Sequence, residues 1–214
     1  AKNIIKFIHS ISQMIESDEL VREYIKVVFI PDYKVTLAEI ILPAADVSEQ
    51  ISQAGKEDSG TGNMKLMLNG AVTLGTMDGA NVEIYEAVGE DNIVIFGLET
   101  EEVEALYAKG YKPWEYYNNS PKIKTVLDFI RTMTVGGMNF NFIVDYLLTQ
   151  DHYMCLADFD SYVEAQERIE KDFNDSSKWM KMSLANIANA GIFSADRSVQ
   201  EYAKDIWHIK PVQD

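Results

Sequence analysis

A glycine-rich turn, Gly60-Thr61-Gly62, stands directly before a run of helix-forming residues at 63–68. Asn69-Gly70 is the next helix breaker, so the pattern predicts a short helix that opens at the turn. The first N–H groups of such a helix have no intrahelical acceptor, and together with the helix dipole they favour an anion such as phosphate. Glycine allows the anion to approach the backbone closely. The turn therefore predicts a phosphate site, where Thr61 can cap the helix and offer its hydroxyl.

Lys65 follows Thr61 by four residues, which places both side chains on one helix face, about 5–6 Å apart. This is about the distance from the phosphate to the reactive carbon of pyridoxal 5′-phosphate, so Lys65 could hold that cofactor while the turn binds its phosphate. The alternative is an ordinary solvated lysine on a helix. The neighbours at 64 and 66–68 are apolar and predict a buried helix, where a lysine without a partner is costly. The predicted burial therefore favours Lys65 as a cofactor-holding residue over an ordinary solvated lysine.

Residues 46–83 contain a series of closely spaced motifs. They are Asp46-Val-Ser-Glu-Gln-Ile-Ser52, Ala54-Gly-Lys-Glu57, Ser59-Gly-Thr-Gly-Asn-Met-Lys65 and Gly75-Thr-Met-Asp-Gly-Ala-Asn-Val-Glu83. Together they closely resemble the α-glucan phosphorylases, the family that includes glycogen and maltodextrin phosphorylase. Weaker similarity covers the rest of the chain, including its ending at 193–207.

The resemblance implies a pyridoxal-phosphate-dependent glycosyltransferase. Such an enzyme cleaves the terminal α-1,4 linkage of a glucan with inorganic phosphate and releases glucose 1-phosphate. It implies that Lys65 carries the cofactor and that Gly60, Thr61 and Gly62 hold the cofactor phosphate. Tyr33 and Lys34 match a segment that lines the cofactor in relatives, many of which have arginine at the position of Lys34.

The same resemblance implies that Glu57, Ser59 and Gly60 contact the glucosyl unit, Glu57 with its carboxylate and the other two with backbone N–H groups. No residue is assigned a catalytic role, because no side chain in the turn is an obvious general acid. Asp58 departs from the family pattern, since relatives commonly have alanine there. We expect its carboxylate to point away from the phosphate, which it would otherwise repel.

Family members are several times longer than the 214 residues of this chain. The resemblance implies an excised part of the C-terminal domain, without the N-terminal domain and without the upstream basic motif that binds substrate phosphate. We expect this piece to be inactive alone and the full enzyme to be a homodimer. The implied fold class is α/β, the later part of a Rossmann-like parallel-sheet domain of the GT-B glycosyltransferase type. Residues 1–112 would form this α/β part with the cofactor lysine, and 113–214 an all-helical C-terminal region.

The order of apolar runs and helical patterns agrees with this class, because alternating strands and helices are typical of a parallel sheet. The predicted strands are 26–30, 71–75 and 92–96. The predicted helices of the first part are 2–16, 36–42, 63–68, 78–88 with Asp78 as an acidic cap, and 99–109, while 44–56 form a connector. After residue 113 only helices are predicted, at 123–134, 140–148, 161–173, 178–190 and 197–207.

Charge and cysteine content exclude several classes of function. The net charge of −15 argues against nucleic acid or an anionic membrane as a partner. No apolar run reaches the length of a membrane span, and no signal peptide opens the chain. The single cysteine, Cys155, cannot form an internal disulfide, which suits a cytoplasmic setting. His9, His152 and His208 form no metal-binding pattern.

Two other functions remain open from the residues alone. One is a non-catalytic module that binds a phosphate or a nucleotide at Gly60-Thr61-Gly62. The turn is neither Gly-x-Gly-x-x-Gly nor a Walker motif, which weakens this alternative. The other is a purely structural or regulatory domain that has lost its cofactor, and the presence of Lys65, Glu57 and the whole turn argues against it.

Overall fold

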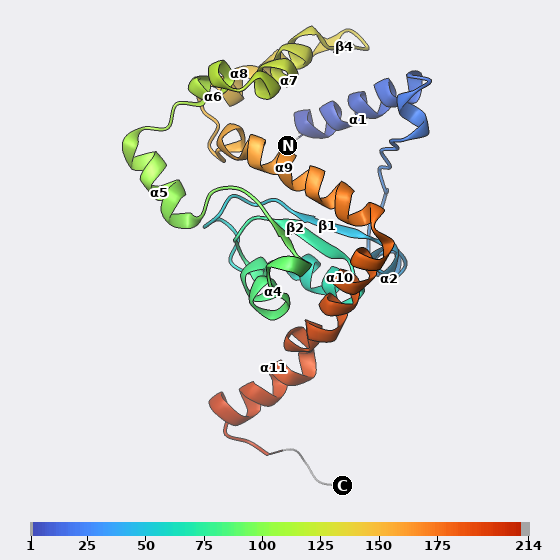
Figure 1. The fold of residues 1–214 in the computed structure, drawn as a ribbon, viewed down its shortest axis with the longest axis vertical. Helices are drawn as coiled ribbons and strands as arrows, with labels where there is room; N and C mark the ends of the chain where they lie inside the picture. The colour runs from blue at the N-terminus through green and yellow to red at the C-terminus, as the bar shows by residue number, and fades with distance from the viewer. Residues whose placement is uncertain (1, 211–214) are drawn as a thin grey trace.

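The structure is a computed structural model that describes residues 2–210. It is built on a parallel sheet of three strands, β1 (Val47–Gln50), β2 (Val72–Gly75) and β3 (Val94–Ile95), in the order β1-β2-β3 (Figure 1). Helix α3 (Thr61–Leu68) joins β1 to β2, and helix α4 (Ala80–Val88) joins β2 to β3. Parallel neighbours need such crossovers, because the chain must return to the same end of the sheet before each strand. The mixed α/β class with a parallel sheet is confirmed.

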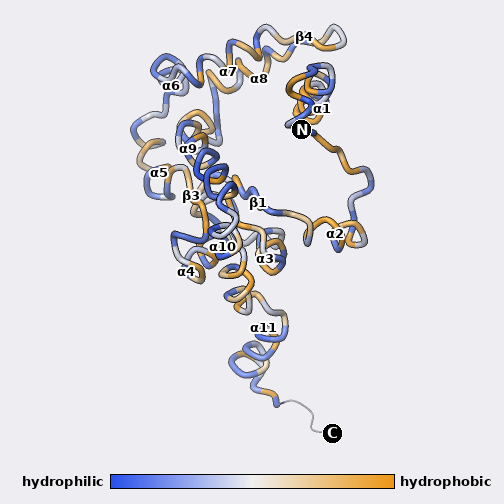
Figure 2. The backbone as a smooth tube through the Cα atoms, turned by 45° about the vertical axis from the view of Figure 1, so that its right-hand side comes forward, coloured by the Kyte–Doolittle hydropathy of each residue, from blue (hydrophilic) through white to orange (hydrophobic). Residues whose placement is uncertain are grey.

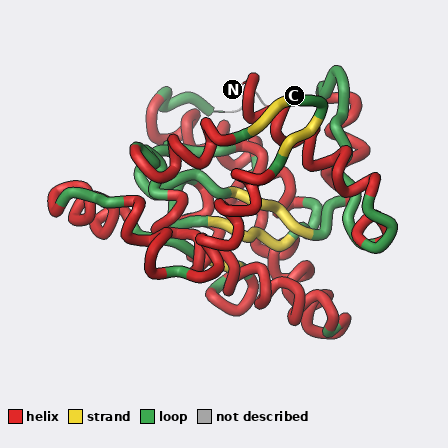
Figure 3. The backbone as a smooth tube through the Cα atoms, turned by 90° about the horizontal axis from the view of Figure 1, so that it is seen from above, coloured by secondary structure: helices red, strands yellow, loops and turns green. Residues whose placement is uncertain are grey.

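Helices make up most of the remaining chain and surround the short strands (Figure 3). They are α1 (Lys2–Ser17), α2 (Val35–Ile41), α5 (Thr100–Lys109), α6 (Pro113–Asn119), α7 (Pro121–Thr132), α8 (Asn141–Thr149), α9 (Cys155–Asn174), α10 (Ser176–Asn189) and α11 (Ala195–Glu201). Shorter helical turns are η1 (Val21–Glu23), η2 (Leu42–Ala44), η3 (Glu90–Asn92), η4 (Ala190–Phe193) and the π-helical η5 (Tyr202–Ile206). Each predicted helix has a counterpart here, although α9 begins at Cys155 rather than at residue 161. Within residues 2–210, none of the helices is both long and apolar enough to cross a membrane.

Helices cover both faces of the sheet, so β2 is buried along its whole length. Successive side chains of a strand point to opposite faces. Val94 and Phe96 pack with residues of α9 and α10 in one core cluster. Ile93 packs with Met67 of α3 and Ile84 of α4 in a cluster on the other face. Helices α9 and α10, which follow residue 112, therefore complete the core of the sheet.

A separate hydrophobic core lies among α1, α6, α7 and α8, in the upper half of Figure 1. Phe140 is fully buried there, and its ring centroid lies 5.0 Å from that of Phe7 in α1. Leu156, near the start of α9, belongs to this core, whereas Ala165 and Ile169 of the same helix pack on the sheet. Helix α9 thus connects the two cores.

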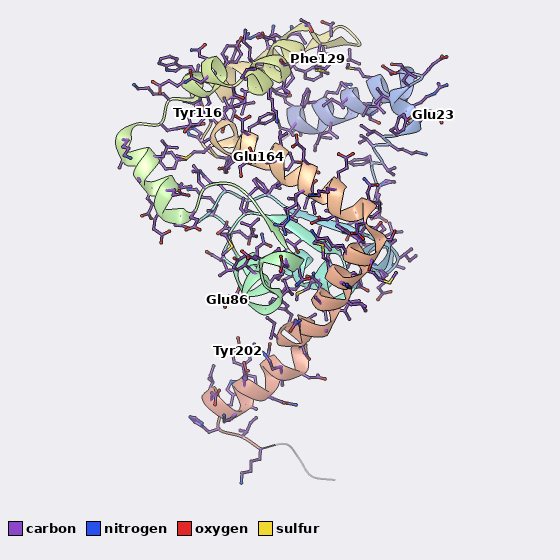
Figure 4. The ribbon with its side chains drawn as sticks, viewed as in Figure 1. Glu23, Glu86, Tyr116, Phe129, Glu164 and Tyr202 are labelled. Atoms are coloured by element: carbon purple, nitrogen blue, oxygen red, sulfur yellow. The ribbon has the colours of Figure 1, made fainter. Side chains whose placement is uncertain are left out.

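The C-terminal segment extends away from the sheet. Helix α11 and the turn η5 project from the rest of the molecule, as the position of Tyr202 in Figure 4 shows. Tyr202 and Ile206 are exposed on this segment. It contributes to none of the core clusters formed by the described residues, apart from Phe193 just before it.

Residues 26–30 do not form the predicted strand. They lie in an extended connection between η1 and α2, where Val28 and Phe29 are 65% and 77% exposed. Figure 2 shows this connection running along the edge of the molecule. A strand needs a neighbour to satisfy its N–H and C=O groups. No strand among the described residues pairs with 26–30, so strand-forming composition alone gives the wrong prediction.

Strand β1 lies inside the stretch 44–56 that the sequence predicts as a connector. Its residues, Val-Ser-Glu-Gln, include one aliphatic side chain, so no apolar run marks it. Pairing with β2 makes it a strand, with Val47 opposite Val72 and Gln50 opposite Gly75. This pairing joins distant parts of the sequence and leaves no local signal.

The region after residue 113 is also not wholly helical, so the prediction of an all-helical C-terminal part is wrong at one place. Strands β4 (Thr134–Val135) and β5 (Met138–Asn139) form a short antiparallel hairpin. Its two-residue turn is Gly136-Gly137, with φ angles of 58° and 77°. Two successive positive φ angles are what a tight hairpin turn requires, and glycine adopts them at little cost.

Candidate functional site

The glycine-rich turn opens a helix, as the sequence predicts. Gly60 is the N-cap of α3 with φ 80° and ψ 108°, a conformation that favours glycine. Thr61 is the first residue of the helix, and no side chain caps it, so the prediction of a Thr61 cap is wrong. The first N–H groups of α3 therefore lack an intrahelical acceptor beside the exposed residues Thr61 and Gly62. This geometry suits a phosphate group.

Helix α3 is only partly buried. Asn63 and Met67 face the core, whereas Thr61 and Lys65 are both exposed. Leu68 is 44% exposed, although its apolar character predicts burial. The prediction that Lys65 lies on a buried helix is therefore wrong, because α3 packs along one side only. Lys65 and Thr61, four residues apart, are accessible together from outside.

A cavity of about 390 Å³ lies between α2 and α3, and Lys65 is one of its walls. Most of the other walls are aliphatic, namely Val35, Ala38, Leu42, Pro43 and Leu68. Binding pockets for ring-shaped cofactors combine such apolar walls with a few polar groups. The residues present fit pyridoxal phosphate, because Lys65 lines a largely aliphatic cavity and its helix begins with N–H groups suited to a phosphate. Among the described residues, the walls of this cavity include none of the turn residues 60–62.

Tyr33 and Lys34 lie directly before α2, so the structure brings their segment next to α3, the helix that carries Lys65. Val35, the next residue, lines the same cavity as Lys65. The two predicted residues themselves are exposed, Tyr33 at 57%. The Lys34 ammonium lies 2.8 Å from the Asp32 carboxylate. Their assignment to the cofactor stays a prediction.

Glu57 and Ser59 lie on the exposed part of the loop that connects β1 to α3. The Ser59 N–H donates a hydrogen bond to the Glu57 carboxylate, with 3.4 Å between nitrogen and oxygen. Asp58 is exposed between them. The structure thus brings Glu57, Ser59 and Gly60 together at the start of α3, one helical turn before Lys65.

Asp78 organises this loop, which the sequence does not reveal. The sequence predicts Asp78 as the cap of its own helix, but the N-cap of α4 is Gly79. The buried Asp78 carboxylate instead accepts hydrogen bonds from the backbone N–H groups of Gly55, Lys56 and Glu57, at 3.0, 3.3 and 2.8 Å. These donors lie more than twenty residues earlier, so no local pattern predicts the contact.

Two asparagines connect α3 to α4. Asn63 donates from its amide to the side-chain oxygen of Asn81 at 2.9 Å, and both side chains are buried. Asn81 in turn donates to the backbone carbonyl of Thr76 at 2.9 Å. Buried amides are stable only when they are hydrogen-bonded. This pair therefore fixes the helix that carries Lys65 against the next crossover helix.

Gly79 allows the loop and α4 to approach closely. Its φ is 51°, and a Cβ atom at this position would lie 2.6 Å from the Ser59 carbonyl oxygen. The Ala80 N–H donates to that same oxygen at 2.5 Å. A side chain at residue 79 would therefore push Ser59 away from its hydrogen bond.

Gly79→Ala should destabilise the chain and displace the loop. The positive φ costs about 1–3 kcal/mol for a residue with a Cβ atom, and the contact with Ser59 adds to this. Gly89→Ala is the matched control, because Gly89 also has a positive φ, 74°, but nothing lies within 4 Å of the place that a Cβ atom would occupy there. Urea unfolding of both variants measures the difference. Equal losses of unfolding free energy would contradict the steric role of Gly79.

The comparison with protein families gives one match that spans most of the chain. Residues 1–209 match the family of the carbohydrate phosphorylases. Among curated proteins, a glycogen phosphorylase of Synechocystis is 49% identical over 215 residues, and one of Bacillus subtilis is 51% identical over 216 residues, each covering 99% of this chain. The muscle form of glycogen phosphorylase from Bos taurus is 44% identical over 216 residues and covers 100% of it.

These alignments cover 25%, 27% and 26% of the three relatives, so the chain spans about a quarter of their length. The family match nevertheless extends across the turn, Lys65 and the loop that Asp78 holds, since it includes residues 1–209. These three relatives are all named glycogen phosphorylase, which agrees with the resemblance drawn from residues 46–83. The chain belongs to the carbohydrate phosphorylase family.

Proposed function

We propose that this chain is the cofactor-holding part of a glycogen phosphorylase, which cleaves the terminal α-1,4 bond of a glucan with inorganic phosphate and releases glucose 1-phosphate. One observation carries the proposal. In a chain of this family, an exposed lysine lies one helical turn after a glycine-rich helix start and lines a largely aliphatic cavity. The names of the relatives support the same activity.

The proposed cofactor is pyridoxal 5′-phosphate. Lys65 would hold it covalently, and Gly60, Thr61 and Gly62 would bind its phosphate through the free N–H groups at the start of α3. When bound, the cofactor would supply a phosphate group that exchanges a proton with the substrate phosphate. The proposed contacts of Tyr33 and Lys34 with the cofactor require these exposed side chains to turn toward the cavity that Val35 lines.

The proposed sugar contacts lie on the loop before the turn. The Glu57 carboxylate would accept a hydrogen bond from a hydroxyl of the glucosyl unit, and the N–H groups of Ser59 and Gly60 would donate to the same sugar. Glu57 is exposed, so its carboxylate is accessible to a ligand. Hydrogen bonds to a charged group are stronger than neutral ones, which makes a carboxylate suitable for holding a hydroxyl.

We also propose the finer features of fold and setting that the family suggests. The parallel sheet with its two crossover helices is consistent with a Rossmann-like, GT-B type domain, in which 1–112 form the α/β part and 113–214 the mainly helical part. The proposed partners are a glucan, inorganic phosphate, an N-terminal domain and a second copy of the enzyme, in the cytoplasm. The 214 residues alone should be inactive, since the resemblance assigns the substrate-phosphate site to another segment.

A hybrid enzyme tests the activity. In this hybrid, residues 1–209 replace the matching segment of the Bacillus subtilis glycogen phosphorylase, and glucose 1-phosphate release from glucan and phosphate is measured. We expect activity from the hybrid and none from the 214-residue chain alone with added cofactor. A folded hybrid that binds pyridoxal phosphate but releases no glucose 1-phosphate would contradict the proposed function.

A further inference from the structure

Residues 76–81 hold the loop between β1 and α3 along its whole length. At one end, the Thr76 hydroxyl donates to the Ser52 carbonyl at 2.5 Å. At the other end, the Ala80 N–H donates to the Ser59 carbonyl, also at 2.5 Å. Between these points the loop has Asp78 as its partner. A loop held at both ends and in the middle has few alternative conformations.

The Asp78 carboxylate is suited to this role by its burial and its donors. It is 8% exposed, and a buried carboxylate is stable only when hydrogen bonds replace its water. One oxygen accepts from the Gly55 N–H at 3.0 Å, and the other accepts from Glu57 at 2.8 Å and from Lys56 at 3.3 Å. Hydrogen bonds to an ionised acceptor are the stronger kind. The backbone of Glu57 is therefore tied directly to Asp78.

The same short segment also fixes the helix of the cofactor lysine. Asn81, three residues after Asp78, accepts the hydrogen bond from Asn63 in the first turn of α3. Asp78 thus sets the position of Glu57 while Asn81 sets that of the helix bearing Lys65. Both contacts come from the segment 78–81, so the separation between Glu57 and Lys65 depends on one short stretch of the chain.

We propose that Asp78 is a positioning residue, which holds the Glu57 backbone at a fixed place relative to the cofactor helix. The inference rests on the proposed function for the role of Glu57 toward the sugar. Asp78 does not touch a substrate and acts only through the loop. A displacement of about 1 Å at a binding group is enough to lower the rate of an enzyme strongly. Loss of the Asp78 contacts should therefore weaken sugar binding without releasing the cofactor.

Amide hydrogen exchange on the 214-residue chain tests the positioning itself. In Asp78→Asn an amide group replaces one acceptor oxygen and opposes the backbone donors. We expect exchange at Gly55, Lys56 or Glu57 to become faster by about tenfold or more, as for the loss of one such bond. The reference is the Val72 amide, which donates to Asp46 within the sheet at 3.0 Å. Unchanged exchange at 55–57 relative to Val72 would overturn the proposal.

Asp151→Asn is the matched control. Asp151 is also buried and accepts from two backbone N–H groups, those of Cys155 at 3.0 Å and Leu156 at 2.9 Å. Replacing the Asp151 carboxylate should make amide exchange at 155 and 156 faster. The exchange rates at 55–57 should stay as in the parent chain. If the amide exchange rates at 55–57 rise as much in Asp151→Asn as in Asp78→Asn, the cause is a general loss of stability and the proposal is overturned.

Kinetics of the hybrid enzyme separate this inference from the proposed function. In Asp78→Asn we expect kcat/KM for glucan to fall by about tenfold with unchanged cofactor content. If kcat/KM for glucan falls in Glu57→Gln but not in Asp78→Asn, the positioning role of Asp78 is overturned and the proposed function stays intact. If kcat/KM for glucan falls in neither variant, Glu57 has no role in sugar binding, and the positioning role of Asp78 is overturned as well. Should Asp78→Asn not fold, Asp78→Glu keeps the charge but moves both oxygens, and the same criteria apply.

Discussion

Lys65→Ala in the hybrid enzyme should remove bound pyridoxal phosphate and lower glucose 1-phosphate release to the background of the assay. Lys65 is the one lysine on α3, and it lines the cavity between α2 and α3. The helix itself should persist, because alanine is a better helix former and the exposed position contributes little to packing. Compared with the cofactor-free parent hybrid, the free energy of unfolding should change by no more than about 0.5 kcal/mol. Cofactor absorbance, activity and urea unfolding are measured on the same preparation.

Lys181→Ala is the matched control for this variant. Lys181 is an exposed lysine in the helix α10 and is not among the residues that line the cavity beside Lys65. Its replacement should leave cofactor content and activity unchanged. If Lys65→Ala retained the cofactor absorbance of the parent enzyme, the assignment of the cofactor to α3 would be wrong.

Glu57→Gln should reduce activity on glucan while the cofactor stays bound. Glu57 is exposed on the loop, so neutralising its carboxylate should cost little stability. Loss of a hydrogen bond to a charged group corresponds to roughly a 10- to 100-fold fall in kcat/KM. Steady-state kinetics with varied glucan and with varied glucose 1-phosphate measure the fall in both directions of the reaction.

Asp58→Asn serves as the control for Glu57→Gln, because it removes the neighbouring exposed carboxylate from the same loop. Activity should remain near that of the parent hybrid, since Asp58 is expected to point away from the ligands. A loss of cofactor in Glu57→Gln as large as its loss of activity would contradict a specific role in sugar binding.

Local signals in the sequence predict most helices of this chain, although α6 (Pro113–Asn119) has no counterpart among the predicted helices. Helix α5 begins with a capping box between Glu99 and Glu102 and ends at Gly110, whose φ is 84°. Helix α7 begins with Ser120 as its cap and Pro121 in its first turn. These capping features act within one or two turns of the helix. They can be recognised from the residues alone.

The strands depend on partners that lie far along the chain. Residues 26–30 have the composition of a strand but no strand partner within the described residues, whereas β1 has one aliphatic residue and becomes a strand by pairing with β2. The pattern of residues along the sequence indicates which segments can adopt the extended conformation. It does not indicate which segments pair with one another.

The candidate site shows the same division between local and distant effects. The turn, the helix and the one-turn spacing of Lys65 are local and are predicted from the sequence. The exposure of Lys65 is not predicted from the sequence, because it depends on the packing of α3 along one side only. The role of Asp78 is not predicted either, because its three donors lie 21 to 23 residues away. Sequence motifs therefore locate the site, and the tertiary structure reveals what holds it in place.

The attachment point of the cofactor tests the central proposal most directly. The hybrid enzyme is loaded with pyridoxal phosphate, reduced with borohydride to fix the cofactor to its lysine, digested, and mapped by mass spectrometry. The proposal predicts that the modified peptide contains Lys65, at one cofactor per chain. Modification of any other lysine, with Lys65 recovered unmodified, would contradict it.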